Sequence, residues 1–218
     1  MEAEDILEDT RWKILCKISK KPVTQSELSE SLNTSLANIS SQMRLLKALK
    51  LVKSKKKNKK KTRGKPQSVY SLGKEFAHIR IVKKDLCEKK KISMNRLDKY
   101  VLTSYFIKEA RYFLLKFYFD HEDLLKKCDS LAFFNIDKNK LNLLAINENK
   151  HELIKAFENV AITGQDKTLK ILVHVYTKQD ITSGINEKKE LFVDMISQSI
   201  LFWDENDFLY KSKVSLFS

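Results

Sequence analysis

The chain has 218 residues, of which 32% are charged and 42% hydrophobic, so it can bury a core and its composition is not that of a disordered chain. Only 4 glycines and 2 prolines argue against collagen-like chains, linkers and glycine-rich phosphate loops. No apolar run approaches the roughly 18 residues of a membrane helix, and the acidic start lacks the basic region of a signal peptide. The three unevenly spaced cysteines, Cys16, Cys87 and Cys128, do not form a disulfide framework, which favours a reducing cytoplasm.

The formal net charge of +14 is distributed unevenly along the chain. Residues 1–10 carry five acids and no base, residues 11–80 carry a large excess of Lys and Arg, and residues 81–218 are nearly balanced. A general lysine bias would spread these charges evenly. A basic patch confined to one part of a chain is instead the electrostatic mark of a nucleic-acid binder.

The first 50 residues predict three helices. Apolar spacing indicates a helix over 5–20, which contains Ile6, Leu7, Trp12, Ile14, Leu15 and Ile18. Thr24 precedes Glu27 by three positions, the pattern of a capping box, so a second helix is expected over 25–32. Asn33-Thr34 predicts a turn and another cap before a third helix over 35–49, whose expected buried side carries Leu36, Ile39, Met43, Leu46 and Leu49.

Two strands around a basic turn follow, beginning at Leu51-Val52 and spanning Val69–Leu72, and residues 53–65 between them hold nine Lys or Arg and no acid. Three helices and a basic hairpin are the element order of a winged helix-turn-helix. Residues 8–80 resemble small archaeal and bacterial repressors of the arsenical-resistance and multiple-antibiotic-resistance type, and Thr34–Val52 is similar to their recognition helix running into the wing.

The resemblance implies double-stranded DNA as a partner. A recognition helix enters the major groove, and the residues expected to face it are Ser35, Ala37, Asn38, Ser41, Gln42, Arg44 and Lys47. Asn and Gln side chains can pair with adenine, while Arg and Lys suit phosphate. The wing is expected to bind phosphates with little sequence preference, through Lys53, Lys55, Lys56, Lys57, Lys59, Lys60, Lys61, Arg63 and Lys65. Arg63, beside Gly64, is also a candidate for the minor groove.

The middle of the chain changes from basic to aromatic. Residues 81–98 are expected to form a basic linker or an exposed helix. Residues 97–119 predict a long connecting helix whose apolar surface covers more than one face. Two explanations stay open for that surface, burial in the C-terminal domain or a homodimer interface with Tyr105, Phe106, Tyr112 or Phe113 at the contact.

The last third predicts alternating strands and helices: strands over 130–134, 141–146 and 169–176, helices over 150–160 and 187–199, and a short apolar end over 200–203. This order resembles the minimal nucleotidyltransferase fold. The family's Asp-x-Asp motif falls on Lys140 and Asn142, its third carboxylate falls on Leu172, and its Gly-Ser falls near Asn135-Ile136. Such enzymes need carboxylates around Mg²⁺, so the resemblance implies a domain unable to perform the family's reaction.

The sequence therefore predicts an α+β protein with a winged helix-turn-helix over 1–80, a basic linker and aromatic helix over 81–119, and a small α/β, nucleotidyltransferase-like domain over 120–218. The expected function is sequence-specific transcriptional regulation by a cytoplasmic homodimer that dimerises through residues 97–119 and the C-terminal domain. No catalytic residue, metal, cofactor or membrane is expected. Two alternatives are a diverged nucleotidyltransferase with a nucleic-acid-binding module, and an RNA-binding or basal transcription accessory factor.

Overall fold

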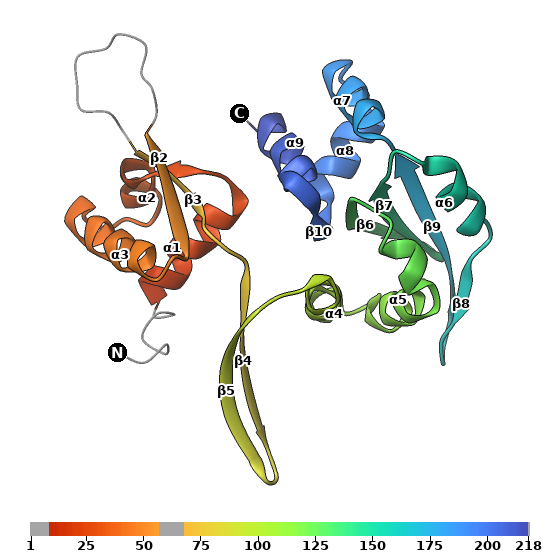
Figure 1. The fold of residues 1–218 in the computed structure, drawn as a ribbon, viewed down its shortest axis with the longest axis horizontal. Helices are drawn as coiled ribbons and strands as arrows, with labels where there is room; N and C mark the ends of the chain where they lie inside the picture. Colours follow the sequence, from red (N-terminus) through yellow and green to blue (C-terminus); the bar gives the residue numbers. More distant parts are fainter. Residues whose placement is uncertain (1–8, 57–67, 218) are drawn as a thin grey trace. The chain divides into compact units, whose positions relative to one another are not determined.

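A computed structural model describes residues 9–56 and 68–217, and it is a mixed α+β structure (Figure 1). The chain divides into two compact units, residues 1–94 and residues 95–218. The expected boundaries lie elsewhere: residue 80 falls inside strand β4 (Phe76–Lys83), and residue 119 falls inside helix α5 (Arg111–Leu125). Both boundaries were placed by changes in composition, and neither change coincides with the end of an element.

The N-terminal unit begins with three helices and a small antiparallel sheet. The helices are α1 (Asp9–Lys20), α2 (Gln25–Ser31) and α3 (Leu36–Ala48). The sheet has the order β1-β3-β2 and contains β1 (Val23–Thr24), β2 (Val52–Lys56) and β3 (Ser68–Leu72). The predicted helices and the predicted strand pair are confirmed over the described residues. Strand β1 was not predicted, because two residues are too few to show a periodicity.

Local contacts fix the ends of these elements. The Glu27 amide donates to Thr24 Oγ1 at 3.2 Å and the Thr24 amide donates to Glu27 Oε2 at 2.6 Å, which completes the predicted capping box of α2. Helix α3 is capped by Ser35 and not by Asn33 or Thr34, since Ser35 Oγ accepts from the Asn38 amide at 3.2 Å.

Gly73 ends β3 at a close approach of two backbones. Its amide donates to the Leu51 carbonyl at 2.7 Å, and a Cβ at this position would lie 2.7 Å from the Lys50 carbonyl oxygen. Only glycine therefore allows this contact between the end of α3 and the end of β3.

The core of this unit is mainly aliphatic and comes from all three helices and the sheet: Ile14, Leu15, Ile18, Val23, Leu28, Ile39, Met43, Leu46, Leu51, Val52 and Tyr70. One expectation was wrong, because Leu36, expected on the buried side of α3, is 51% exposed, and Trp12 of α1 is likewise 53% exposed. Each lies in the first turn of its helix, beyond the reach of the core. Helical spacing alone does not show where a buried stripe begins.

Residues 76–93 form a second antiparallel hairpin, so the prediction of a basic linker or exposed helix over 81–98 was wrong. Strand β4 pairs with β5 (Leu86–Ser93) through eight residue pairs, and Lys84-Asp85 makes the turn with Asp85 at φ 66°. The β-branched residues Ile79, Ile81 and Val82 favour a strand, and the many lysines obscured this signal.

The C-terminal unit contains a five-stranded sheet of order β10-β6-β7-β9-β8. Its strands are β6 (Ser130–Asp137), β7 (Lys140–Ile146), β8 (Ala161–Thr163), β9 (Thr168–Tyr176) and β10 (Ile200–Asp204). Strands β7 and β9 are parallel, and the other neighbours are antiparallel. The three predicted strands are confirmed as β6, β7 and β9, and the predicted apolar end is a paired strand, β10.

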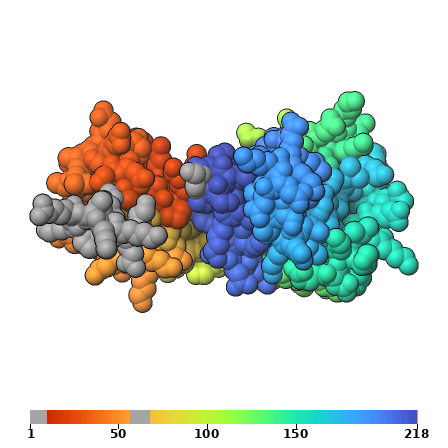
Figure 2. All heavy atoms as spheres, turned by 90° about the horizontal axis from the view of Figure 1, so that it is seen from above, coloured from red at the N-terminus to blue at the C-terminus, as the bar shows by residue number. Residues whose placement is uncertain are grey.

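Helices cover both faces of this sheet. One face packs against α4 (Arg96–Phe106), α5 and α6 (Lys150–Ala156), and the other packs against α7 (Lys178–Asn186), α8 (Glu190–Gln198) and α9 (Phe208–Leu216). Figure 2 shows α7 and α9 side by side on the surface of this unit. The single long helix expected over 97–119 was wrong, because residues 107–110 separate α4 from α5.

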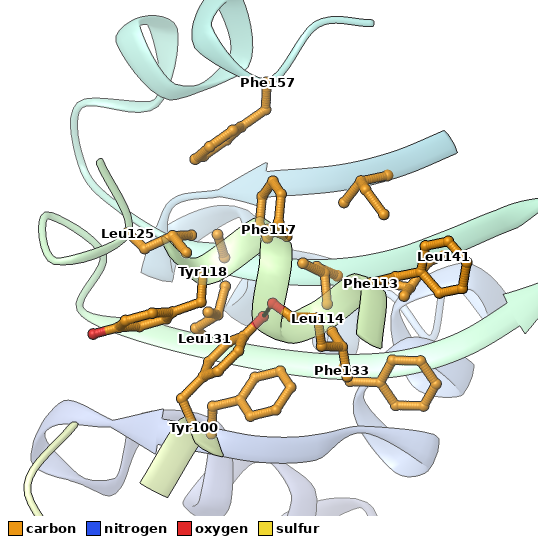
Figure 3. Close-up of a cluster of buried hydrophobic side chains, with 14 of the residues drawn as sticks. Tyr100, Phe113, Leu114, Phe117, Tyr118, Leu125, Leu131, Phe133, Leu141 and Phe157 are labelled. Carbon is orange, nitrogen blue, oxygen red and sulfur yellow. Dashed lines mark hydrogen bonds between the residues drawn. The ribbon is translucent and has the colours of Figure 1, made fainter. Parts of the chain in front are cut away.

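Aromatic rings fill the core between α4, α5 and the sheet (Figure 3). The Tyr100 ring stacks on Phe202 with centroids 4.2 Å apart, and its hydroxyl donates to the Leu114 carbonyl at 3.0 Å. Burial raises the pKa of Tyr100 well above its usual value. Phe113 belongs to this core and is 5% exposed, so the expectation that it could lie at a dimer contact was wrong.

Candidate nucleic-acid interface

Helix α3 turns one side to the core and a polar side outward. Ile39, Met43 and Leu46 are buried. The residues predicted to contact DNA lie away from them: Ser35, Ala37, Ser41, Arg44 and Lys47 are exposed, and Asn38 and Gln42 are half-buried. The structure therefore brings all seven predicted residues of the recognition helix to the side of α3 that the core leaves uncovered.

The two amide side chains on this side belong to a continuous chain of hydrogen bonds. Arg11 Nε donates to Gln42 Oε1 at 2.7 Å, and Gln42 Nε2 donates to Asn38 Oδ1 at 3.3 Å. Asn38 Nδ2 then donates to Thr34 Oγ1 at 3.1 Å. The chain begins on α1 and follows α3 towards its N-terminus, so it holds both amides in one orientation.

These bonds leave part of each amide available. A primary amide has two N–H donors and two acceptor lone pairs, and the chain uses one donor and one acceptor lone pair of Asn38 and the same of Gln42. Reading adenine bidentately takes one donor and one acceptor from the same amide. Both side chains therefore keep that capacity, in an orientation already fixed by their neighbours.

Sequence reasoning missed three residues of this surface. Arg11 and Thr34 hold the ends of the hydrogen-bonded chain, and Leu36 is exposed in the first turn of α3. The spacing of Thr34, Asn38 and Gln42 by four residues was visible in the sequence. The contact of Arg11 was not, because it joins residues 31 positions apart.

The basic residues of the predicted wing are only partly described. Lys53, Lys55 and Lys56 are exposed on β2, and alternation along the strand places Lys53 and Lys55 on one face and Lys56 on the other. The remaining predicted wing residues lie outside the described residues: Lys57, Lys59, Lys60, Lys61, Arg63 and Lys65.

The described cations of this surface have no described acid beside them. Arg44, Lys47, Lys53, Lys55 and Lys56 form no ion pair with any residue of 9–56 or 68–217. Positive side chains that have no described acid partner can bind a polyanion. The row of oriented amides beside them can recognise other groups of the same polyanion through hydrogen bonds.

In the C-terminal unit, a lysine, an amide and an aliphatic side chain occupy the positions where the nucleotidyltransferase resemblance expects carboxylates, namely Lys140, Asn142 and Leu172. Lys140 is exposed, and Asn142 lies beside Leu172 in the parallel pair of β7 and β9. Asn142 Nδ2 donates to Asn135 Oδ1 at 2.7 Å, and Asn142 Oδ1 lies 3.0 Å from His174 Nε2. Burial lowers the pKa of His174, so this network is uncharged at neutral pH.

Carboxylates near this sheet are held by lysines. Asp129 Oδ2 lies 2.6 Å from Lys178 Nζ, and Asp180 Oδ2 lies 2.8 Å from Lys150 Nζ. The hydrogen bond from Lys150 lowers the pKa of Asp180 to about 2. Within residues 9–56 and 68–217, no three His, Cys, Asp or Glu side chains gather in a way that could hold a metal ion. The thiol of Cys128 is also unreactive, because burial raises its pKa to about 12.

Four aromatic side chains of α4 and α5 face outward. Tyr105, Phe106, Tyr112 and Phe119 are exposed, and Phe106 is 86% exposed. The Arg111 guanidinium lies 3.5 Å from the centre of the Tyr105 ring. Tyr105, Phe106, Tyr112 and Phe119 are called here the aromatic patch. They are the part of the expected aromatic surface that the C-terminal core does not bury.

No protein-family model matches the chain, and no curated protein matches it either. Among the helices of the described residues, none combines the length and the apolar character needed to cross a membrane.

Proposed function

We propose that the N-terminal unit is a winged helix-turn-helix that binds double-stranded DNA, and that the protein is a sequence-specific regulator of transcription in the cytoplasm. Helix α3 is the recognition helix and β2–β3 is the wing. The observation that carries the proposal is the row of Thr34, Asn38 and Gln42, oriented by Arg11 and flanked by cations that form no ion pair with a described residue.

In this function α3 lies in the major groove. Asn38 and Gln42 contact base edges, and the exposed Leu36 and Ala37 are suited to the methyl group of thymine. Arg44 and Lys47 follow one to two turns later and contact phosphates, as do the lysines of β2. Affinity then comes mainly from the cations, and sequence preference comes from the N-terminal half of α3.

Selection from a library of random duplexes, followed by sequencing, tests this proposal. We expect the full-length protein to enrich one motif, and Asn38→Ala/Gln42→Ala to retain DNA but lose the motif. Glu30→Ala/Ser31→Ala, two exposed positions on α2, is the matched control and should keep it. Failure of the wild-type protein to enrich any motif contradicts the proposal.

We propose that the C-terminal unit has a nucleotidyltransferase-like fold and does not catalyse the reaction of that family. Support comes from the order of β6, β7 and β9 and from the absence of a carboxylate at the expected metal-ligand positions Lys140, Asn142 and Leu172, of which Asn142 is hydrogen-bonded to His174. We expect no incorporation of labelled nucleotide into nucleic acid or protein in the presence of Mg²⁺. Metal-dependent transfer would instead support the alternative of a diverged enzyme.

We also propose a homodimer held by the aromatic patch and the C-terminal unit. One DNA-binding module buries only about 600–1,000 Å² on DNA, and a two-fold pair of modules reads two half-sites about 34 Å apart. Light scattering should give twice the mass of the 25.5 kDa chain at micromolar concentration. Phe106→Glu should yield a folded monomer, whereas Val82→Glu, at an exposed apolar residue of the N-terminal unit, should remain a dimer. A monomeric wild-type protein contradicts this proposal.

A further inference from the structure

The C-terminal unit has a hollow at the outer edge of its sheet, between α6 and β9, which lie side by side in Figure 1. The hollow has a volume of about 500 Å³, and its lining comes from residues 151–159 and 170–174. Small-molecule sites in proteins usually enclose about 300–1,000 Å³. This space, called here the edge hollow, is therefore large enough for a small organic molecule.

One wall of the edge hollow is an open strand edge. The Ile171 amide donates to the Val160 carbonyl at 2.9 Å, and beyond this contact no described strand pairs with the outer side of β9. The Lys170 amide turns the other way and donates to the Asn139 carbonyl at 2.8 Å. Because successive amides alternate along a strand, the Val173 amide points to the open edge. It can donate a hydrogen bond to a molecule in the edge hollow.

The edge hollow also has an apolar part. Phe157 is buried with its ring 5.5 Å from that of Phe117, so its position is fixed by the aromatic core. Leu172 and Val173 are half-buried on the strand side, and Ile154 is 48% exposed on the helix side. A ligand with an apolar body would remove this surface from water, which favours binding.

Two lysines line the edge hollow from different elements. Lys155 is on α6 and Lys170 is on β9, and both are exposed. Neither forms an ion pair with an acid in the part of the chain that the structure describes. Glu158 is the acid among the described lining residues. Two lysine charges against one carboxylate leave a formal excess of one positive charge, with histidine counted as neutral.

A second hollow of about 470 Å³, between α6 and α7, differs in this respect. The lysines that line it lie beside acids, since Lys150 Nζ is 2.8 Å from Asp180 Oδ2 and Lys189 Nζ is 2.8 Å from Glu187 Oε2. Paired lysines attract a further anion less than lysines without an acid beside them. Of these two hollows, the edge hollow is therefore the better site for an anion.

We propose that the edge hollow binds a small organic monocarboxylate. The apolar body of the ligand lies against Phe157 and Leu172, and its carboxylate is bound by Lys155 and Lys170. A carboxylate matches the single excess positive charge. A phosphate monoester carries about 1.5–2 negative charges at pH 7 and would also be repelled by Glu158. This inference goes beyond the proposed function, because it concerns the C-terminal unit and does not require DNA binding.

Titration of the full-length protein with para-fluorobenzoate, followed by fluorine NMR, tests this inference. The neutral amide para-fluorobenzamide has the same apolar body, and wild type should bind it about tenfold more weakly than the carboxylate. Lys155→Gln/Lys170→Gln should weaken binding of the carboxylate about tenfold and leave binding of the amide unchanged. Lys188→Gln/Lys189→Gln removes two exposed lysines beside the second hollow and should bind both compounds as wild type does.

Three results overturn the inference. They are the absence of saturable para-fluorobenzoate binding to wild type, equal weakening in the two double variants, and tighter binding of para-fluorophenyl phosphate than of para-fluorobenzoate, which would assign the edge hollow to a phosphate ester. Circular dichroism shows whether each variant keeps its fold. If a double variant does not fold, the single substitutions Lys155→Gln and Lys188→Gln repeat the comparison.

Failure of this inference and failure of the proposed function can be told apart. Asn38→Ala/Gln42→Ala should bind para-fluorobenzoate as wild type does, and Lys155→Gln/Lys170→Gln should enrich the same DNA motif as wild type. Lack of motif enrichment by wild type contradicts the proposed function alone, and lack of carboxylate binding contradicts this inference alone.

Discussion

The two units differ in how their lysines are placed relative to acids. In the C-terminal unit, several lysines lie beside carboxylates, as in the pairs Lys178–Asp129, Lys150–Asp180 and Lys116–Asp120, whereas others, such as Lys140 and Lys170, form no ion pair with a described residue. On α3 and β2, the described cations have no described acid as a partner. Lysines paired with acids contribute little to long-range attraction, whereas unpaired lysines create a field that draws in anions. The comparison locates the capacity to bind a polyanion in the N-terminal unit, even though both units are rich in lysine.

The cores differ as well. The N-terminal core is built mainly from Ile, Leu, Val and Met side chains, and the C-terminal core contains stacked and tilted rings around Tyr100, Tyr118 and Phe117. Aromatic side chains bury more surface each than aliphatic ones. Substitutions in the C-terminal unit should therefore affect folding most, and substitutions on α3 and β2 should affect binding most.

The largest effect is expected for Phe117→Ala. Phe117 is fully buried in the C-terminal core, so its truncation should lower the free energy of unfolding of that unit by about 3–5 kcal/mol in urea titrations. Asp123→Ala, six residues along the same helix at a side chain that is 99% exposed, is the control and should change stability by less than about 0.5 kcal/mol. Equal losses for both variants would show that burial along α5 is misassigned.

A smaller effect is expected at the N-terminus of α3. Ser35→Ala removes the side chain that caps the Asn38 amide and should destabilise the N-terminal unit by about 0.5–2 kcal/mol. Ser41→Ala lies at an exposed position inside the same helix, where alanine favours the helix slightly, so it should be neutral or stabilising. Thermal unfolding followed by circular dichroism measures both, and a neutral Ser35→Ala variant would argue against the cap.

The smallest effect concerns pH. Burial lowers the pKa of His174, so the unfolded chain binds a proton more readily than the folded one. The stability from the neutral ring is fully present above the unfolded pKa of about 6.5 and is lost as pH falls towards the folded pKa. Unfolding midpoints between pH 7.5 and pH 5 should therefore fall less in His174→Gln than in wild type. His151→Gln, at an exposed histidine of α6, should behave as wild type does, and parallel curves for all three proteins would exclude this role.

Features that depend on residues close together in the sequence could be predicted, whereas contacts between distant segments could not. The capping box of Thr24 and Glu27 and the buried spacing of Ile39, Met43 and Leu46 each depend on residues within one or two turns. The Thr177 and Asp180 capping box that begins α7 was equally visible, but it was overlooked among predicted strands and helices. By contrast, the burial of Phe113 and the bond from Arg11 to Gln42 depend on segments far away in the sequence. The candidate site was thus predictable as a list of exposed residues on α3, but not as a hydrogen-bonded row.

The most direct test of the central claim compares cations of the two units in one assay. Lys53→Gln/Lys55→Gln/Lys56→Gln removes three lysines from β2, and Lys116→Gln/Lys126→Gln/Lys127→Gln removes three lysines that lie beside acids in the C-terminal unit. Fluorescence anisotropy of the full-length proteins on a random duplex, measured over a range of salt concentrations, gives the slope for each. If β2 contacts phosphates, the first variant should reduce the slope by about 3 and the second should leave it at the wild-type value. Equal slopes for the two variants would contradict the account, because the lysines of β2, which have no described acid partner, would then contribute no more to DNA binding than the paired ones.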